Sequence, residues 1–220
     1  MSIRLLALAV FIGSLATVHA DQIKYVVYDK DEKRGTLVDE ITGDDDSGYV
    51  DESTLTITRD GKTVSIHELT HYDKTGADTS KSLDTTDNDK ELKIKAALSD
   101  DGAKVTVWEG DDKTEPPAVP LASKTSRVDP TNFWFKKGSP DVGTSVVYQG
   151  FDVLEGKWSD ITLKYVGKKK IKVDGQEVEA NEIDRTEGDD SSTIYVDSKG
   201  DLVLLVDGDM RIERQMTVSA

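Results

Sequence analysis

TLTITRDGKTVSIHELTHY, residues 54–72, decides how the chain folds, because it fits two incompatible structures. Its first part alternates apolar and polar residues around Asp60-Gly61, a dipeptide typical of tight β-hairpin turns. Its last part, His67-Glu68-Leu69-Thr70-His71, matches the H-E-x-x-H pattern that binds zinc when it lies on a helix. A strand here predicts a sheet protein without this site, whereas a helix predicts a zinc hydrolase.

The residues around the motif favour the strand. Thr63–Ile66 leave the turn as mainly strand-favouring residues, and no clear helix cap precedes the motif. On a strand, residues four apart are separated by roughly 13 Å. Two ligands of one zinc ion cannot be that far apart, because each nitrogen lies about 2.1 Å from the metal. We therefore predict no catalytic residue, no metal ligand and no cofactor for the chain.

The helix is the alternative, and it carries a specific chemistry. HELTH resembles the zinc-binding helix of thermolysin-like metallopeptidases. By that resemblance His67, His71 and Glu91 are the zinc ligands, and Glu68 is the catalytic base that activates the metal-bound water. On a helix, residues four apart lie about 6 Å from each other on one face, so both imidazoles reach one ion. The alternative function is a secreted zinc metallopeptidase with zinc as its cofactor.

A second Asp-Gly hairpin supports the strand. Ile57–Leu69 aligns with Ile171–Ile183 at a constant offset of 114 residues. The second copy keeps the turn, as Asp174-Gly175, together with the apolar positions and the glutamate. Asparagine and arginine stand there in place of the two histidines. The same pattern is therefore compatible with sheet geometry and needs no metal.

The rest of the chain has the same periodicity. Short runs alternate apolar and polar residues between Gly and Asp turns, and no amphipathic helix of three turns appears after residue 20. We predict an all-β protein, with a strongly curved antiparallel sheet or open half-barrel of about ten or eleven strands. Residues 79–90 are polar and are predicted to be irregular. Lys168–Lys170 is predicted to be a charged hairpin turn.

The N-terminal 20 residues are predicted to be a secretory signal peptide. Arg4 precedes a short apolar run from Leu5 to Val18, and Ala20 completes a small-residue cleavage pattern; cleavage after Ala16 also fits. A span needs about 20 apolar residues, so no membrane span is expected in the mature protein. Residues 21–220 are expected to form one domain, with two halves meeting near 115–130 as an alternative. The predicted location is the bacterial periplasm or the exterior.

Composition narrows the possible partners. The chain has 28 basic and 43 acidic residues and a net charge of −15, which argues against nucleic acid and anionic membrane surfaces. It has no cysteine, which excludes thiol catalysis and cysteine metal sites. An exported domain without disulfides must be stabilised by its core.

The second half resembles bacterial exported half-barrel proteins of the lipoprotein-carrier type. The likeness rests on the aromatic segment Phe133–Phe135 and on three strand-and-turn patterns, Val142-Gly143-Thr144, Tyr165-Val166-Gly167 and Tyr195-Val196-Asp197. It implies a concave apolar face able to hold an acyl chain or a hydrophobic segment of a partner, and it identifies no ligand-binding residue. We expect an exported, non-enzymatic β-protein that binds a lipid or other apolar ligand, binds a protein partner, or has an envelope-associated structural role.

Overall fold

The computed structural model describes residues 22–216, apart from residues 45, 60, 88–89, 122–124, 129–133 and 136–138, so the signal-peptide segment lies outside it. All the elements formed by the described residues are strands of one antiparallel sheet, and the all-β prediction is confirmed. The strands are β1(Ile23–Asp29), β2(Glu32–Asp44), β3(Gly48–Arg59), β4(Lys62–Tyr72), β5(Asp78–Asp87), β6(Lys90–Ser99), β7(Gly102–Glu109), β8(Asp112–Thr114), β9(Val119–Pro120), β10(Ser145–Asp152), β11(Lys157–Val173), β12(Gln176–Glu187), β13(Asp190–Val196), β14(Leu202–Asp207) and β15(Met210–Arg214).

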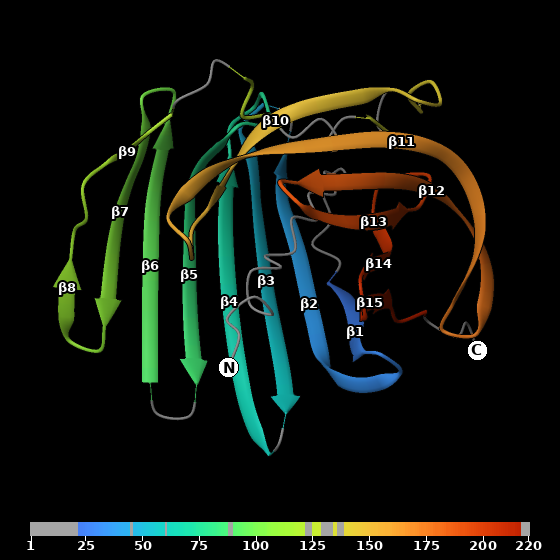
Figure 1. Ribbon diagram of the computed structural model, residues 1–220, viewed down its shortest axis with the longest axis horizontal. Helices are drawn as coiled ribbons and strands as arrows, with labels where there is room; N and C mark the ends of the chain where they lie inside the picture. The colour runs from blue at the N-terminus through green and yellow to red at the C-terminus, as the bar shows by residue number, and fades with distance from the viewer. Residues whose placement is uncertain are drawn as a thin grey trace.

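The sheet is a meander that is broken in the middle of the chain. Its order is β10-β11-β12-β13-β14-β15-β1-β2-β3-β4-β5-β6-β7-β8, with β9 also paired to β7. Because β15 pairs with β1, the first and last strands lie inside the sheet rather than at its edges. The edges come from mid-chain strands, β8 and β10, so the sheet is open (Figure 1).

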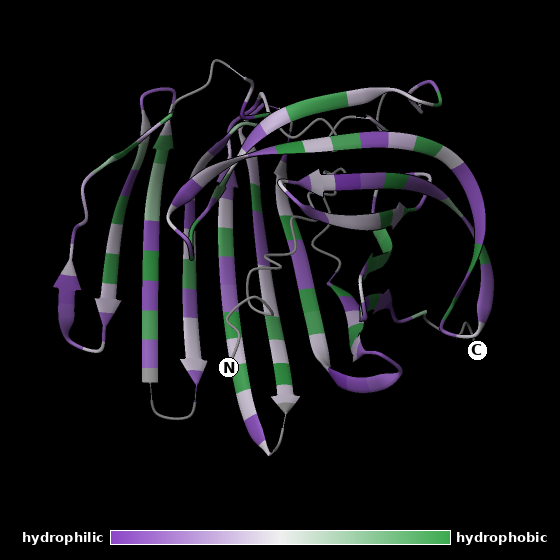
Figure 2. Cartoon of the chain, viewed as in Figure 1, coloured by the Kyte–Doolittle hydropathy of each residue, from purple (hydrophilic) through white to green (hydrophobic). Residues whose placement is uncertain are grey.

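The sheet curves strongly, which brings its two ends over each other. β2–β8 form one wall, and β10 and β11 arch across its top (Figure 1). Phe151 and Trp158, from the β10–β11 hairpin, stack edge to face with centroids 5.0 Å apart. They belong to one core cluster with Ile66, Leu83 and Ile94 on the concave face of β4–β6. Alternating hydropathy along the strands supplies these inward-facing residues (Figure 2).

Two further inward-facing clusters extend the inner core. One joins β1, β2, β14 and β15 through Tyr25, Leu37 and Ile212. The other joins β10–β13 through apolar and aromatic side chains, and Trp134 and Phe135 pack against it from the connection before β10. Trp134 and Phe135 of the aromatic segment are therefore part of this core, whereas Phe133 lies outside the described residues.

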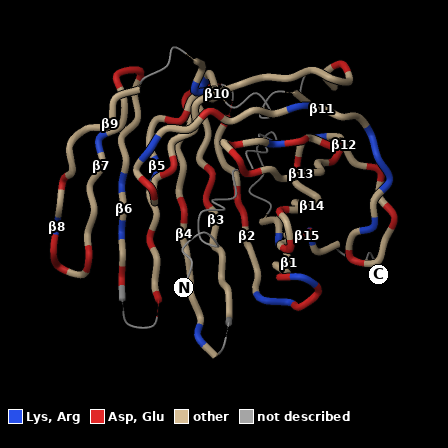
Figure 3. The backbone as a smooth tube through the Cα atoms, viewed as in Figure 1, with Lys and Arg blue, Asp and Glu red and all other residues tan. Residues whose placement is uncertain are grey.

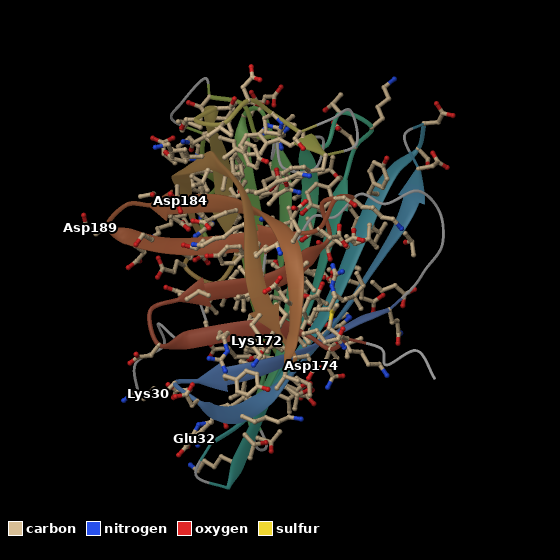
Figure 4. The ribbon with its side chains drawn as sticks, turned by 90° about the vertical axis from the view of Figure 1, so that its right-hand side faces the viewer. Lys30, Glu32, Lys172, Asp174, Asp184 and Asp189 are labelled. Carbon is tan, nitrogen blue, oxygen red and sulfur yellow. The ribbon has the colours of Figure 1, made fainter. Side chains whose placement is uncertain are left out.

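A smaller core lies on the outside of the sheet. The β11–β12 hairpin is long enough to curl over β13 and β14, so Val173 and Ala180 pack against Tyr195 and Leu204. Asp174 fixes the hairpin tip: its backbone N–H donates to Glu213 Oε1 over 2.9 Å, and its Oδ2 accepts from the Met216 N–H over 3.1 Å. Figure 4 shows this tip, with Lys172 and Asp174 labelled.

Both predicted Asp-Gly hairpins are present. β3 and β4 pair up to Arg59 and Lys62, which leaves a two-residue turn with Gly61 at φ 74°. β11 and β12 meet in the same way at Asp174 and Gly175, with φ values of 47° and 78°. Positive φ at both central residues is the conformation that Asp-Gly turns favour. Asp60 itself lies outside the described residues.

Three sequence predictions need correction. The described residues form fifteen strands rather than the predicted ten or eleven. Part of the excess is β5, which occupies most of the polar stretch predicted to be irregular. The reason is its position between β4 and β6, where backbone pairing on both sides holds a polar strand in the sheet.

The third correction concerns the predicted lysine turn. Lys168–Lys170 lies inside the single 17-residue strand β11, after a bulge at Gly167. Each lysine forms an ion pair with a glutamate of β12: Lys168 with Glu179, Lys169 with Glu182 and Lys170 with Glu177, at 3.0, 2.8 and 2.9 Å. A lysine cluster that signals solvent exposure fits a strand equally well when a facing strand carries the opposite charge.

Candidate functional site

Buried polar residues line part of the concave face, across β2–β5. The strand register sets Asp51, Thr70 and Lys81 side by side on three neighbouring strands. Asp39 lies on the same face of β2. Asp39, Asp51 and Lys81 are only 2%, 8% and 1% exposed. Figure 3 shows that charged residues otherwise spread along the strands and turns. These buried charges are the most unusual chemical feature of the described residues.

Lys81 is the cation of this group. Its Nζ donates to the backbone carbonyl of Phe151 over 3.2 Å and lies 3.5 Å from Asp78 Oδ2. Its charge also acts on Asp51 and Glu68, whose pKa values it lowers against the effect of burial. Because Phe151 belongs to β10, the ammonium ties the arching strand to the wall beneath it.

Asp78 links these buried polar residues to Arg127, in the segment between β9 and β10. Arg127 Nη1 donates to the backbone carbonyl of Asp78 over 2.5 Å and to its Oδ1 over 3.2 Å. The same guanidinium donates to Asp100 Oδ1 through Nη2 over 3.0 Å. The contacts of Asp78 with Arg127 and Lys81 are structural, because they fasten a crossing segment to β5 and the β6–β7 turn.

Asp39 and Asp51 form a pair of carboxyls joined by a hydrogen bond. Burial raises the pKa of Asp39 to about 7, against the hydrogen bond from Asp51, and the charge of Asp201 adds to the increase. Burial and then the charge of Asp39 raise the pKa of Asp51 well above its usual value. In this pair the Asp51 carboxyl is the donor and the Asp39 carboxyl is the acceptor. Burial also raises the pKa of Glu68.

Tyr25 extends the polar group toward β15. It is paired across the strands with Arg214, whose Nη1 donates to Asp197 Oδ2 over 2.9 Å. Burial and then the charge of Asp39 raise the pKa of Tyr25. Within the described residues, Asp201 Oδ1 and Arg214 Nε of this corner have no hydrogen-bond partner. Tyr25 therefore belongs both to this polar corner and to the apolar cluster of Leu37 and Ile212.

The H-E-x-x-H segment is a strand, as the sequence favoured. It forms the second half of β4, so side chains alternate between the two faces. Glu68 lies inside with the buried carboxyls, whereas His67 and His71 lie on the outer face. His67 Nε2 is 2.8 Å from Glu52 Oε1 in an exposed pair. The helix that the zinc alternative requires is not formed, and the proposed base lies on the opposite face from the proposed ligands.

Glu91, the third ligand of that alternative, is also displaced. It is on β6, with β5 between it and the motif, and it pairs with Thr86. Neighbouring strands are about 4.8 Å apart, so two strand spacings separate Glu91 from β4. Among the described residues no group of three His, Asp or Glu side chains could hold a metal ion.

The concave face of the second half is occupied by the protein's own side chains. Phe135 packs edge to face on Tyr165, with centroids 5.9 Å apart, and both are buried with Tyr148 and Leu163. The apolar surface implied by the likeness to lipoprotein carriers is present, but in the described residues it is core rather than exposed lining.

The β10 edge carries the exposed apolar residues. Val142, Val147 and Val166 are 72%, 47% and 37% exposed, and all three lie on or beside the β10–β11 hairpin. Among the described residues no strand pairs with the other side of β10. This edge has no signal in the sequence, because strand order is not encoded in local periodicity.

One solved structure with a similar fold emerges from the comparisons with known proteins. No family model matches the chain, and no curated protein matches it significantly. It is similar to the crystal structure of a β-barrel-like protein of domain of unknown function DUF1849 from Brucella abortus, with a TM-score of 0.55, 13% identity, and coverage of 88% of this chain and 96% of that chain. A DUF1089 family protein from Pseudomonas aeruginosa aligns with a TM-score of 0.40 and 10% identity over 76% of this chain and 87% of that chain.

At this identity the first comparison shows a common fold alone. It supports a β-barrel-like fold, while the resemblance to lipoprotein carriers stays a prediction. Within the part of the chain that is described, no helix has the length and apolar character needed to cross a membrane.

Proposed function

We propose that the chain is an exported, non-enzymatic β-protein that binds another protein. Of the three roles expected from the sequence, an apolar ligand, a protein partner and a structural role in the envelope, the partner agrees best with the geometry. One observation carries this choice: side chains of the protein occupy the concave face, while the sheet remains open at β10.

An apolar ligand fits less well. Phe151 and Trp158 occupy the surface over β4–β6 that an acyl chain would need. Lys81, Asp51 and Asp39 lie beside them. An acyl chain placed against these polar side chains would remove water from them, and this cost would offset the free energy gained by burying the hydrocarbon. An acyl chain would have to displace the β10–β11 hairpin from its own core.

The non-enzymatic part of the proposal is supported by the arrangement of the candidate catalytic groups. The two histidines of the mature chain are His67 and His71, and they lie on the outer face of β4, away from Glu68. A base and its metal ligands must converge on one water molecule, which opposite faces of a sheet do not allow.

Native mass spectrometry of the protein, purified from the exported fraction without chelator, tests this function. We expect a mass that matches the chain after loss of residues 1–20, without lipid or metal, and a specific cross-linked complex with a second protein in intact cells. An adduct of lipid mass would refute the preference for a partner. One zinc per chain, lost on His71→Ala, would refute the non-enzymatic assignment.

A further inference from the structure

We infer that residues 151–158, around the turn of the β10–β11 hairpin, form a cap that closes on the wall at acidic pH and lifts from it as the pH rises above neutral. The contacts involved lie within the chain, so this response does not depend on the proposed function. Three features of the cap carry the inference: it is held on the wall without strand pairing, it covers buried carboxyls, and it carries a carboxyl of its own.

Side-chain contacts, rather than a strand ladder, hold the cap on the wall. Among the described residues, β10 pairs with no strand except β11. Phe151, Val153 and Trp158 pack against the apolar residues of β4–β6. Lys81 Nζ donates to the Phe151 carbonyl over 3.2 Å, and Trp158 Nε1 donates to the Val119 carbonyl over 3.3 Å. The cap can therefore lift while every strand pair of the sheet stays intact.

The part of β10 just before the cap is fastened more firmly. The Gln149 N–H donates to the Ser126 carbonyl over 2.8 Å. Arg127, the next residue, donates to the backbone carbonyl and to the carboxylate of Asp78 at the start of β5. These contacts hold β10 on the wall as far as Gln149, so the movement is limited to the residues beyond it.

The cap lies over carboxyls of the wall. Asp39, Asp51 and Glu68 are on the inner face of β2–β4, in two neighbouring rows of the strand register. Burial and the charge of Asp152, which belongs to the cap, raise the pKa of Glu68 against the charge of Lys81. We call Asp39, Asp51, Glu68 and Asp152 the carboxyl group of the cap. With all four ionised, the closed cap would hold like charges on both sides of its contact with the wall.

Other charged and titratable residues face this carboxyl group from the elements packed around it. They are Tyr25 of β1, Asp78 of β5, Arg127 before β10, Glu155 in the turn, Lys157 and Asp160 of β11, Arg185 and Glu187 of β12, Asp201 before β14 and Arg214 of β15. The cations among them are each paired with a carboxylate outside the group. Lys81 is therefore its main cation.

A rise in pH charges the carboxyl group and favours the lifted cap. Burial raises the pKa of Asp39 to about 7 and the pKa of Asp51 well above its ordinary value. Burial also raises the pKa of Asp152. A lifted cap returns these carboxyls to water, where their pKa values are near 4. The preference for the closed cap is therefore complete below about pH 4 and is lost as the pH rises through about 7.

Thiol labelling tests the inference, because the parent chain has no cysteine. Val153→Cys places a thiol on the buried side of the cap, and Val203→Cys places one in the separate core outside the sheet. Each labelling rate is divided by that of the exposed Asp184→Cys at the same pH, which corrects for thiol ionisation. Val153→Cys should react at least about tenfold faster than Val203→Cys at every pH, because a local opening needs less free energy than unfolding.

The corrected rate of Val153→Cys should also rise at least about tenfold between pH 6 and pH 8.5, the change that one carboxyl with the pKa of Asp39 produces. Leu154→Cys, on the same turn, is a second probe and should behave alike. Equal rates for Val153→Cys and Val203→Cys would show that only unfolding exposes the cap, and this result would overturn the inference. A rate at the cap that does not rise with pH would overturn it as well.

Substitution of the carboxyls identifies the origin of the pH response. Asp39→Asn combined with Asp51→Asn removes both charges and keeps side chains that form hydrogen bonds. In the Val153→Cys chain this double substitution should hold the corrected rate within about threefold over the same pH range. Asp189→Asn, at an exposed turn labelled in Figure 4, is the matched control and should leave the full rise. A full rise in the double variant would refute the role of these carboxyls.

Discussion

Replacing Asp39 by asparagine should stabilise the protein above neutral pH and weaken the pH dependence of its unfolding. Burial raises the pKa of Asp39 from 3.8 to about 7 in the folded chain. The folded carboxyl therefore holds its proton while the unfolded one loses it. Below the pKa of the unfolded carboxyl both states are protonated, so the free energy of unfolding does not depend on this group. The free energy of unfolding then falls as the pH rises from about 4 to about 7. The neutral asparagine side chain would mimic the protonated form at every pH.

The magnitude follows from the pKa values. One pKa unit corresponds to about 1.4 kcal/mol, so a rise of about three units sets a maximum near 4 kcal/mol over the whole window. Between pH 5 and pH 8 an independent carboxyl with these values would lose about 2–3 kcal/mol. The asparagine amide also keeps a donor and an acceptor for the carboxyl of Asp51, so the substitution leaves that group with a hydrogen-bond partner.

The assay is urea unfolding followed by tryptophan fluorescence at pH 5 and pH 8. The free energy of unfolding of the parent should fall between these values by about 2 kcal/mol more than that of Asp39→Asn. Asp184→Asn, at an exposed position labelled in Figure 4, is the matched control and should follow the parent. Equal pH dependence in the parent and Asp39→Asn would refute the assignment of the buried proton to this pair.

Further substitutions test other parts of the structure. Lys81→Met removes the ammonium that faces Asp51, Asp78 and Glu68 and should cost roughly 3–5 kcal/mol in urea unfolding, whereas Lys113→Met on β8 should change it by less than about 0.5 kcal/mol. Gly35→Ala places a Cβ 1.9 Å from the Thr56 carbonyl oxygen, so it should lower the unfolding free energy by about 2–3 kcal/mol; Thr36→Ala, at an exposed position, should not. His71→Ala should alter neither the stability by more than about 0.5 kcal/mol nor the metal content in native mass spectrometry, because its side chain is exposed on a strand.

Local patterns in the sequence were sufficient for the hairpins. Asp-Gly turns and alternating residues predicted β3–β4 and β11–β12, and the strand context of HELTH outweighed its motif. The polar strand β5 has too few apolar residues to show a clear alternation in the sequence. It forms because its backbone pairs with β4 on one side and with β6 on the other. A lysine row was taken for a turn because the glutamates that neutralise it lie on another strand.

The buried charges were also missed, although a signal for them exists. Asp39 stands between Leu37 and Ile41 in the alternation of β2, and Lys81 precedes Leu83 in that of β5. A charged residue at an inward position usually indicates an edge or a solvated face. Only the curvature of the sheet, which places the β10–β11 hairpin over these positions, turns them into interior residues, and curvature has no short-range signature.

The pairing of β15 with β1 makes the centre of the sheet the last part that can assemble. Other neighbouring strands are joined by short connections, so they meet quickly, while this pair must close a loop of almost the whole described chain. During synthesis from the N-terminus, β1 emerges long before β15 exists. Two separate meanders, β1–β8 and β10–β15, would form first and would then join through the pairing of β15 with β1. On the proposed export route, this order would postpone completion of the sheet until the C-terminal strand has crossed the membrane, because β1 has no partner on its β15 side before then.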